Sequence, residues 1–459
     1  MALGRQGAVQ EALLIGWHEM PSAPGHVFYD RLNAVLDEAG FDREVEALCA
    51  PHYASGAGRP SIPPGRYFRM LFVGYFEGLD SERGIAWRCA DSLSLRQFLK
   101  LGTSAAVPDH STLSRTRGRL PLEVHDAVFA LVLGLLSARG LVRGRRLGVD
   151  ASTLEANAAM RTIVRREDGA GWQAMLGELA RASGLATPSA DQLRQFDRTR
   201  TGKRVSNADW VSPVDPEARI TRLKDGRTRL AYKPEHAVDL DSGAILAAAV
   251  HPGDAGDTRT LETTLEIAAS NLETVELAPK PEAPAEVVAD KGYHAREILK
   301  RLADGPWTTR IAEPGRRTVL RWHGDDEARR AVYANRRRLL SGVARLALVL
   351  RAVLCERAFA HVLDRGGMRR TWLRGRENVA KRYRAHVTAY NLGLIMRALF
   401  GAGTPRAAAE VRFLWLAAHD CLILVLLTSP PTGSTAPAAP HATAVLIVTP
   451  DDVPLSTGC

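Results

Sequence analysis

The chain has 459 residues, of which 46% are hydrophobic and 24% are charged, and its formal net charge is +10. A chain of this length can bury a large core and is expected to form more than one unit, since domains commonly contain about 100–200 residues. It is therefore not a small disulfide-stapled protein, and no early segment has the roughly 18 consecutive apolar residues of a membrane span.

Five cysteines are scattered along the chain without a CxxC or a Cys/His spacing. Zinc sites and disulfide frameworks need regular spacings of that kind. The N-terminus also lacks the charged and then apolar pattern of a signal peptide. We therefore expect a soluble protein of a reducing cytoplasm, without zinc and without a membrane partner.

Positive charge is concentrated in one part of the chain. Residues 316–384 contain 19 Arg or Lys and 6 Asp or Glu. Such a block indicates a polyanionic partner, because each neutralised phosphate releases counterions and adds sequence-independent affinity. A solvated helix face is the alternative interpretation of a charge run.

The first 140 residues are mainly helical in pattern. Residues 1–58 mix helical patches with loops, and residues 59–140 form a helical region that we expect to bind DNA ends. Asp109 or Ser111 can cap a short helix that carries three arginines and ends before Pro121. This pattern is typical of a small DNA-reading helix, and a capped surface helix fits it equally well.

Two apolar runs end in an aspartate. Residues 146–149 lead into Asp150, and residues 287–289 lead into Asp290, which Lys-Gly-Tyr follows. Both runs predict buried strands that carry a carboxylate to the carboxyl edge of a sheet, where active sites of open sheets lie. Glu356, within the strongly helical residues 350–361, is the proposed third member. Two strand aspartates and a helix glutamate can bind two divalent metals, although each acid taken alone could equally cap a helix or pair with an arginine.

The order of the remaining elements predicts the fold class. Residues 161–230 are charged and irregular, a hairpin follows over 232–250, and a helix covers 258–272 before the Asp290 strand. Asp254 and Asp257 after the hairpin are rival carboxylates, although turn acids are usually only solvated. This order indicates an α/β mixed sheet flanked by helices, as in ribonuclease H-like folds. Its catalytic domain would span residues 141–400, with a small insertion over 300–345, and residues 401–459 would form a low-complexity tail.

Several motifs carry a family resemblance. Asp150 in Gly-Val-Asp-Ala-Ser-Thr, Asp290 in Ala-Asp-Lys-Gly-Tyr and Glu356 in Glu-Arg-Ala-Phe-Ala-His occur in order, followed by a Gly-Gly-Met-Arg-Arg-Thr-Trp-Leu-Arg-Gly block and by residues 391–397. This set resembles the DDE transposases of bacterial insertion sequences, above all the insertion-sequence-four and -five type.

The resemblance has several implications for function. It implies a ribonuclease H-like core, two Mg²⁺ ions with Mn²⁺ as a substitute, double-stranded DNA with terminal inverted repeats as substrate, a homo-oligomer on DNA, and a cytoplasmic, nucleoid-associated bacterial protein. Asp150 would bridge both ions, and Asp290 and Glu356 would each complete one. The candidate DNA contacts are Arg115, Arg117, Arg336, Arg337, Arg338, Arg351, Arg357, Arg369, Arg370, Arg374 and Lys381.

The predicted function is cutting and joining of DNA at the ends of an insertion sequence by two-metal phosphodiester hydrolysis and strand transfer. Trp372 could stack on a displaced base, and a place in the core fits it equally well. A catalytically inactive DNA-binding protein derived from such an element is the alternative. Cleavage of an inverted-repeat duplex separates the two hypotheses.

Overall fold

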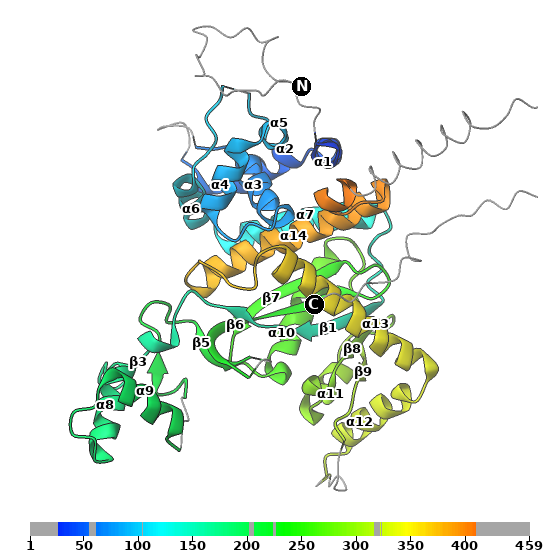
Figure 1. Ribbon diagram of the computed structural model, residues 1–459. Helices are drawn as coiled ribbons and strands as arrows, with labels where there is room; N and C mark the ends of the chain where they lie inside the picture. The colour runs from blue at the N-terminus through cyan, green and yellow to red at the C-terminus, as the bar shows by residue number, and fades with distance from the viewer. Residues whose placement is uncertain are drawn as a thin grey trace, which may run out of the picture. The chain divides into compact units, whose positions relative to one another are not determined.

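Figure 1 presents the computed structural model, in which helices surround one large sheet. The structure describes residues 26–54, 61–102, 104–201, 206–223, 226–315, 322 and 324–409. The expected tail therefore lies outside the described residues from residue 410 onward.

Helices α1 to α7 precede the first strand and share one apolar core. The predicted cap is confirmed in α6, where the Asp109 carboxylate accepts a hydrogen bond of 2.7 Å from the Thr112 N–H. Helix α3 is buried from Tyr67 to Tyr75 and so forms the centre of this part. The bounds are α1 (Val27–Glu38), α2 (Phe41–Cys49), α3 (Pro64–Phe76), α4 (Glu82–Asp91), α5 (Leu93–Phe98), α6 (His110–Arg119) and α7 (Leu122–Ala138).

The main sheet has the mixed topology that the sequence predicts. Antiparallel pairing joins β7 to β6 and β6 to β1, and parallel pairing then joins β1 to β8 and β8 to β9. The short strands β2 and β5 extend the sheet along the first half of β6. The bounds are β1 (Arg146–Ala151), β2 (Leu154–Glu155), β5 (Arg219–Arg222), β6 (Thr228–Asp239), β7 (Ile245–Pro252), β8 (Ala285–Ala289) and β9 (Trp307–Ile311).

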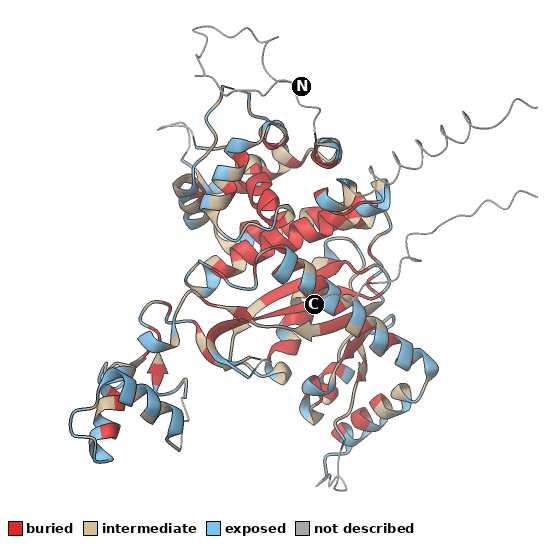
Figure 2. Ribbon diagram, viewed as in Figure 1, coloured by how far each residue is buried: buried red, intermediate tan, exposed pale blue. Residues whose placement is uncertain are grey.

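Helices from three parts of the chain pack on this sheet. Helix α10 covers β6 and β7, α13 lies along β1 and β8, and α14 packs on β7 as well as on α3 and α7. Helix α14 is buried along most of its length, and Figure 2 shows it in red between the N-terminal helices and the sheet. The bounds are α10 (Asp257–Glu273), α11 (Arg296–Ala303), α12 (Asp326–Leu339), α13 (Gly342–Phe359) and α14 (Arg376–Phe400).

Residues 161–230 are a correction to the sequence analysis. The described residues of this range are not irregular: they contain α8 (Trp172–Ala182), α9 (Ala190–Thr199), the two-stranded sheet of β3 (Val164–Arg165) and β4 (Trp210–Val211), and β5. The Trp172 and Trp210 rings pack edge to face, and their centroids are 5.3 Å apart. Such short strands leave no two-residue alternation in the sequence, which is why the pattern was not visible.

The expected insertion over 300–345 is also corrected. Strand β9 lies inside this range and pairs in parallel with β8 along its whole length, so it belongs to the main sheet. Helix α11 is the crossover between these two strands. Among the described residues of this range, α12 is the one element between β9 and α13. In contrast, the predicted hairpin and the helix over 258–272 are confirmed by β6, β7 and α10.

Within the described ranges, no single helix is both long and apolar enough to cross a membrane; α6 and α7 pass that test only as a pair, and they are bent by 97°.

Gly148 in the middle of β1 allows α13 to approach the sheet. A Cβ at this position would stand 2.6 Å from Leu240 Cδ2 and 3.2 Å from both Arg351 Cγ and Cys355 Sγ. We predict that Gly148→Ala lowers the free energy of unfolding by about 1–3 kcal/mol through overpacking. Urea unfolding followed by circular dichroism measures this change.

The matched control is Gly134→Ala in α7, where an added Cβ meets nothing within 4 Å. Alanine there should leave stability unchanged or raise it by up to about 1 kcal/mol through helix propensity. Equal effects of the two substitutions would contradict the close approach at Gly148.

Candidate active site

Asp150 and Asp290 lie side by side at one edge of the main sheet. Strands β1 and β8 run parallel with Val149 opposite Ala289. The residue that follows each of these two is an aspartate, so both aspartates lie at the same carboxyl edge of the sheet. The local sequence explains this: an apolar run forms each buried strand, and the carboxylate comes where the strand leaves the core.

Both carboxylates lie on the sheet face that α13 covers. Gly148 faces Arg351 and Cys355 of α13, and its register partner Val288 packs with Ala347 of the same helix. Because side chains alternate between the faces of a strand, residues two positions further along lie on the same face. Asp150 and Asp290 are those residues.

Arg351 of α13 contacts both aspartates. Its Nη2 stands 2.8 Å from Asp150 Oδ1 and 3.7 Å from Asp290 Oδ2, and its Nε donates a hydrogen bond of 3.1 Å to the Val149 carbonyl. The Arg351 side chain is only 10% exposed, whereas that of Asp290 is 48% exposed. Asp150 Oδ1 also accepts a hydrogen bond of 2.8 Å from the Ala151 N–H.

Glu356 lies further along α13, at its C-terminal end. It is exposed, and it lines a cavity of about 370 Å³ together with Asp150, Ser152, Asp364 and Arg369. The structure therefore joins Asp150 to Asp290 through Arg351 and joins Asp150 to Glu356 through this cavity. Asp290 is not part of the cavity lining.

A buried aromatic stack fixes the end of α13 near Asp150. Asp150 is the register partner of His236 on β6, and the His236 ring stacks on Phe359 with centroids 4.1 Å apart. Tyr383 of α14 contacts the Nε2 atom of His236 at 2.8 Å. Burial lowers the pKa of His236 to about 3, so the ring is neutral near pH 7. Glu356 precedes Phe359 by about one helical turn and is positioned with it.

The turn after Asp290 is tied to the buried carboxylate of Glu235. Asp290 caps the short helix η4 (Lys291–Tyr293) by accepting a hydrogen bond of 2.8 Å from the Gly292 N–H. Tyr293 then donates a hydrogen bond of 2.9 Å to Glu235, which is fully buried on β6. Burial, together with the charges of Glu235, Asp257 and Asp150, raises the pKa of Tyr293 well above its ordinary value.

Glu235 belongs to a polar network that sequence analysis missed. Thr260 and Thr264 of α10 donate hydrogen bonds of 2.7 Å and 2.5 Å to its carboxylate. Lys233 stands 3.5 Å from Glu235 and 2.6 Å from Asp257. The available signal was the run Lys233 to His236, in which charged side chains interrupt a strand that is otherwise apolar.

Asp257 and Asp254, the rival acids, have separate surroundings. Asp257 lies beside the Asp290 turn, since a Cβ on Gly292 would stand 2.5 Å from Asp257 Oδ2 and 3.0 Å from Asp290 Oδ1. Asp254 accepts a hydrogen bond of 3.1 Å from Asn207. Asp257 is therefore the closer of the two to the strand-end acids, and Lys233 neutralises it.

The basic candidates divide into two groups. Arg117, Arg338, Arg351 and Lys381 are bound within the fold: for example, Lys381 is 5% exposed and pairs with Glu377. Arg336 is 34% exposed, and it pairs with both oxygens of Glu313. All five side chains hold contacts within the protein. The exposed group consists of Arg115, Arg337, Arg357, Arg369, Arg370 and Arg374.

The exposed group extends past the cavity. Arg369 lines it, forms two contacts of 2.8 Å with Asp364 and donates a hydrogen bond of 3.3 Å to Ser152. The Arg370 guanidinium lies 4.9 Å from the centroid of the Trp372 ring. Trp372 is 48% exposed and its indole N–H donates to Asp80, so its ring is not a core residue.

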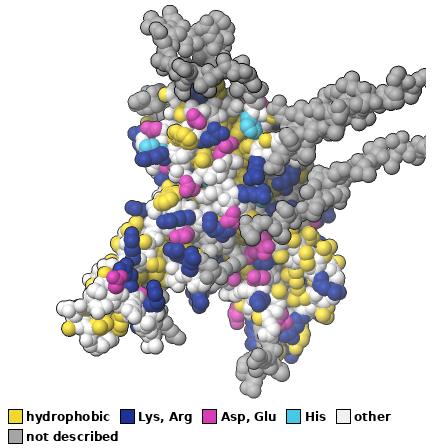
Figure 3. All heavy atoms as spheres, in the orientation of Figure 1, with side chains coloured by type: hydrophobic (Ala, Val, Ile, Leu, Met, Phe, Trp, Pro, Cys, Tyr) yellow, Lys and Arg dark blue, Asp and Glu magenta, His cyan; other side chains and the backbone are white. Residues whose placement is uncertain are grey.

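The outer face of α13 is largely apolar, although Arg345 is exposed on the same helix. Leu340 before the helix and Val343, Leu346, Val349 and Val353 within it are exposed, and Figure 3 shows hydrophobic side chains gathered over this helix. The basic block of residues 316–384 is thus interrupted by an apolar surface next to Glu356.

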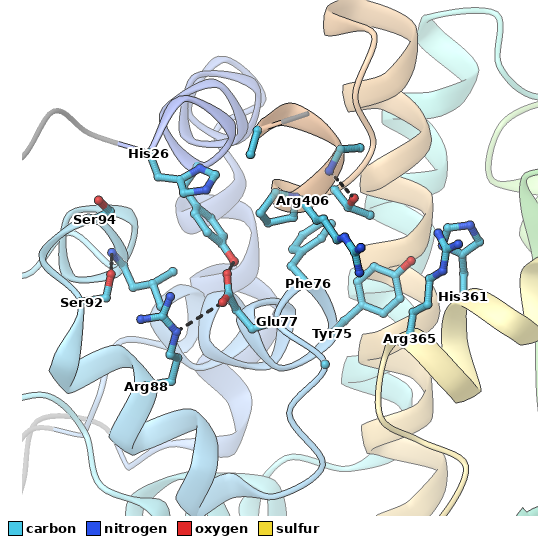
Figure 4. A pocket seen from close by; sticks show the side chains of 17 residues that line it. His26, Tyr75, Phe76, Glu77, Arg88, Ser92, Ser94, His361, Arg365 and Arg406 are labelled. Atoms are coloured by element: carbon cyan, nitrogen blue, oxygen red, sulfur yellow. Dashed lines mark hydrogen bonds and ion pairs between the residues drawn. The ribbon is translucent and has the colours of Figure 1, made fainter. Parts of the chain in front are cut away.

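A larger cavity lies away from the strand-end acids. It has a volume of about 750 Å³, and its wall contains Tyr75, Arg88, Arg365 and Arg406 (Figure 4). Glu77 accepts hydrogen bonds from Tyr29 and Arg88 in this wall. The cavity contains none of the three candidate acids, so we place the candidate active site at the smaller one.

Two family comparisons fit this arrangement. Residues 18–119 match the family described as Transposase domain (DUF772), and residues 216–392 match the family described as Transposase DDE domain. Together the two matches cover more than half of the chain. The chain belongs to the DDE transposases of insertion sequences. No curated protein and no solved structure matches the chain.

The transposase fold is ribonuclease H-like, as the sequence analysis expected. The Transposase DDE match contains Asp290 and Glu356, whereas Asp150 lies between the two matched ranges. Asp150 is thus associated with the other two acids by the geometry alone.

The three acids fit a hard divalent cation by their chemistry. Carboxylate oxygens are the ligands that Mg²⁺ prefers, and Asp150 and Asp290 already share one cationic group, Arg351. In the part of the transposase that the structure describes, no three His, Cys, Asp or Glu side chains converge as a metal site.

Removal of the Tyr293 hydroxyl tests how much its hydrogen bond to Glu235 stabilises the turn after Asp290. We predict that Tyr293→Phe lowers the free energy of unfolding by about 1–2 kcal/mol, because a buried carboxylate loses a donor. Tyr333→Phe at the exposed Tyr333 is the control. Thermal unfolding of both variants measures the difference, and equal melting temperatures would contradict the role of this hydrogen bond.

Proposed function

We propose that the transposase cuts DNA at the terminal inverted repeats of an insertion sequence and joins the ends to target DNA. The observation that supports this is the parallel register that brings Asp150 and Asp290 to one sheet edge, on the face covered by the helix of Glu356. Three carboxylates from distant parts of the chain fit metal-dependent phosphodiester chemistry.

In this proposal Asp150, Asp290 and Glu356 would hold two divalent ions, with Asp150 as the ligand common to both. Two Mg²⁺ ions, or Mn²⁺ in their place, supply activation of the attacking oxygen and stabilisation of the leaving oxygen. The chain fixes the acids: the Ala151 N–H orients Asp150, the Gly292 N–H orients Asp290, and Phe359 anchors the helix of Glu356.

The DNA path in this proposal follows the exposed cations. Arg357 and Arg369 lie near the acids, and Arg370 and Arg374 continue past Trp372. Guanidinium groups at a surface suit phosphate oxygens. The transposase would act on both ends of the element as a homo-oligomer.

Substitution of each acid tests the catalytic assignment. We expect Asp150→Asn, Asp290→Asn and Glu356→Gln each to lower cleavage of a labelled inverted-repeat duplex at least about a hundredfold in Mg²⁺, since a metal contributes several kcal/mol to the transition state. The control is Asp254→Asn, whose carboxylate binds Asn207 and is not near the cavity.

Cleavage at the parent rate by all three variants would exclude the assignment. Salt-sensitive binding without cleavage by the parent protein, in Mg²⁺ and in Mn²⁺, would instead favour the inactive DNA-binding protein.

The division of the basic residues gives a second test. Arg374→Ala and Arg357→Ala should each weaken DNA binding about two- to tenfold near 0.1 M salt and reduce the salt slope by about one, because each removes a phosphate contact. Arg338→Ala should lower the melting temperature instead, because this side chain donates to the Thr309 carbonyl at 2.7 Å. Fluorescence anisotropy over a salt series measures binding, and equal slopes for all variants would contradict the proposed path.

A further inference from the structure

Arg351 is the one cation that contacts both strand-end aspartates among the described residues. Its Nη2 stands between Asp150 Oδ1 at 2.8 Å and Asp290 Oδ2 at 3.7 Å. Sequence analysis treated Arg351 as a DNA contact, but its side chain is only 10% exposed. A guanidinium in this position interacts with the acids and not with a phosphate backbone.

The Arg351 side chain is held in place from two sides. Its Nε donates to the Val149 carbonyl at 3.1 Å, and its Cγ lies 3.2 Å from where a Cβ of Gly148 would be. Any side chain larger than hydrogen at Gly148 would push against this stem. Withdrawal of Arg351 would break the bond to β1 and leave a guanidinium buried against the sheet, which is costly. The charge therefore stays beside the aspartates.

A fixed positive charge at this position acts on metal binding in two ways. It reduces the electrostatic repulsion between the two carboxylates. A metal ion that binds them therefore gains less free energy from removing that repulsion. It also repels a divalent ion directly. For two charges about 4 Å apart and an effective dielectric constant of about 20, either effect alone exceeds a tenfold change in Mg²⁺ affinity. Water around the half-exposed Asp290 reduces the size of both effects.

We infer that Arg351 is a built-in counter-ion of the Asp150–Asp290 pair and holds down the affinity of this pair for Mg²⁺. This inference rests on the proposed function, which assigns the pair to metal binding. Arg351 is a positioning residue and touches no reacting atom. If Arg351 lowers the affinity of this pair, the protein alone binds Mg²⁺ weakly. Additional oxygen ligands, such as those of a DNA phosphate, are then needed for tight binding.

The test is a Mg²⁺ titration of the full-length protein without DNA, followed by melting temperature. Arg351→Met keeps the aliphatic stem and removes the charge. We expect the Mg²⁺ concentration for half of the maximal rise to fall about tenfold, and the melting temperature without Mg²⁺ to fall as well. Arg351→Lys keeps the charge and should titrate within about threefold of the parent.

Arg338→Met is the matched control, because Arg338 also donates its Nε to a strand carbonyl, that of Thr309, and contacts neither aspartate. It should destabilise the protein without moving the Mg²⁺ midpoint. Arg351→Gln provides a second uncharged variant, should Arg351→Met not fold. A midpoint that is unchanged or higher in the folded uncharged variant would overturn the inference.

Asp290→Asn separates this inference from the proposed function. If Asp290→Asn abolishes the Mg²⁺ shift while the uncharged Arg351 variant titrates like the parent, the metal assignment holds and the role of Arg351 is wrong. If the parent responds to Mg²⁺ and Asp290→Asn titrates like it, or if no variant responds to Mg²⁺, the metal assignment is wrong and the inference fails with it. A shift that appears only in the uncharged Arg351 variant supports both.

Discussion

Parallel pairing of β1 with β8 is the constraint on which the candidate active site depends. In this register Gly148 opposes Val288 and Val149 opposes Ala289, which fixes where both strands end and which face their last side chains occupy. A slip by one residue would turn one aspartate to the opposite face, away from α13. The apolar residues of both strands prevent such a slip because their burial would be lost. Hydrophobic pairing thus positions two polar groups that repel each other.

The neighbouring elements then compensate for the cost of these acids and of Glu235. A buried carboxylate is tolerated only when donors surround it, and Glu235 has Tyr293, Thr260 and Thr264. This network joins β6, α10 and the Asp290 turn into one unit. On the other face, His236 and Phe359 join β6 to α13. The two faces of β6 therefore position Asp290 and Glu356 independently, from neighbouring residues of one strand.

The parts of this fold that were predictable are those with strong local signals. An apolar run that ends in an acid predicts a strand and the place of its carboxylate, and Asp109 before Thr112 predicts a helix start. Strand β9 was missed because its sequence, Trp-Thr-Thr-Arg-Ile, has few apolar residues and only its pairing with β8 makes it a sheet strand. The network around Glu235 was not visible because its members are far apart in the chain.

The basic residues illustrate a different limit of sequence analysis. A count of charges predicts a polyanionic partner, but it cannot distinguish a guanidinium at the surface from one that neutralises a carboxylate inside the fold. Arg351 pairs with Asp150 inside the fold, and Arg338 is held by the carbonyl and the hydroxyl of Thr309. Each of these two arginines donates its Nε to a strand carbonyl. In the proposed function, the surface available to DNA is smaller than the basic block and is interrupted by the largely apolar face of α13. Electrostatic attraction of DNA would then come from few exposed side chains, such as Arg357 and Arg374, whereas Arg351 neutralises charge within the site itself.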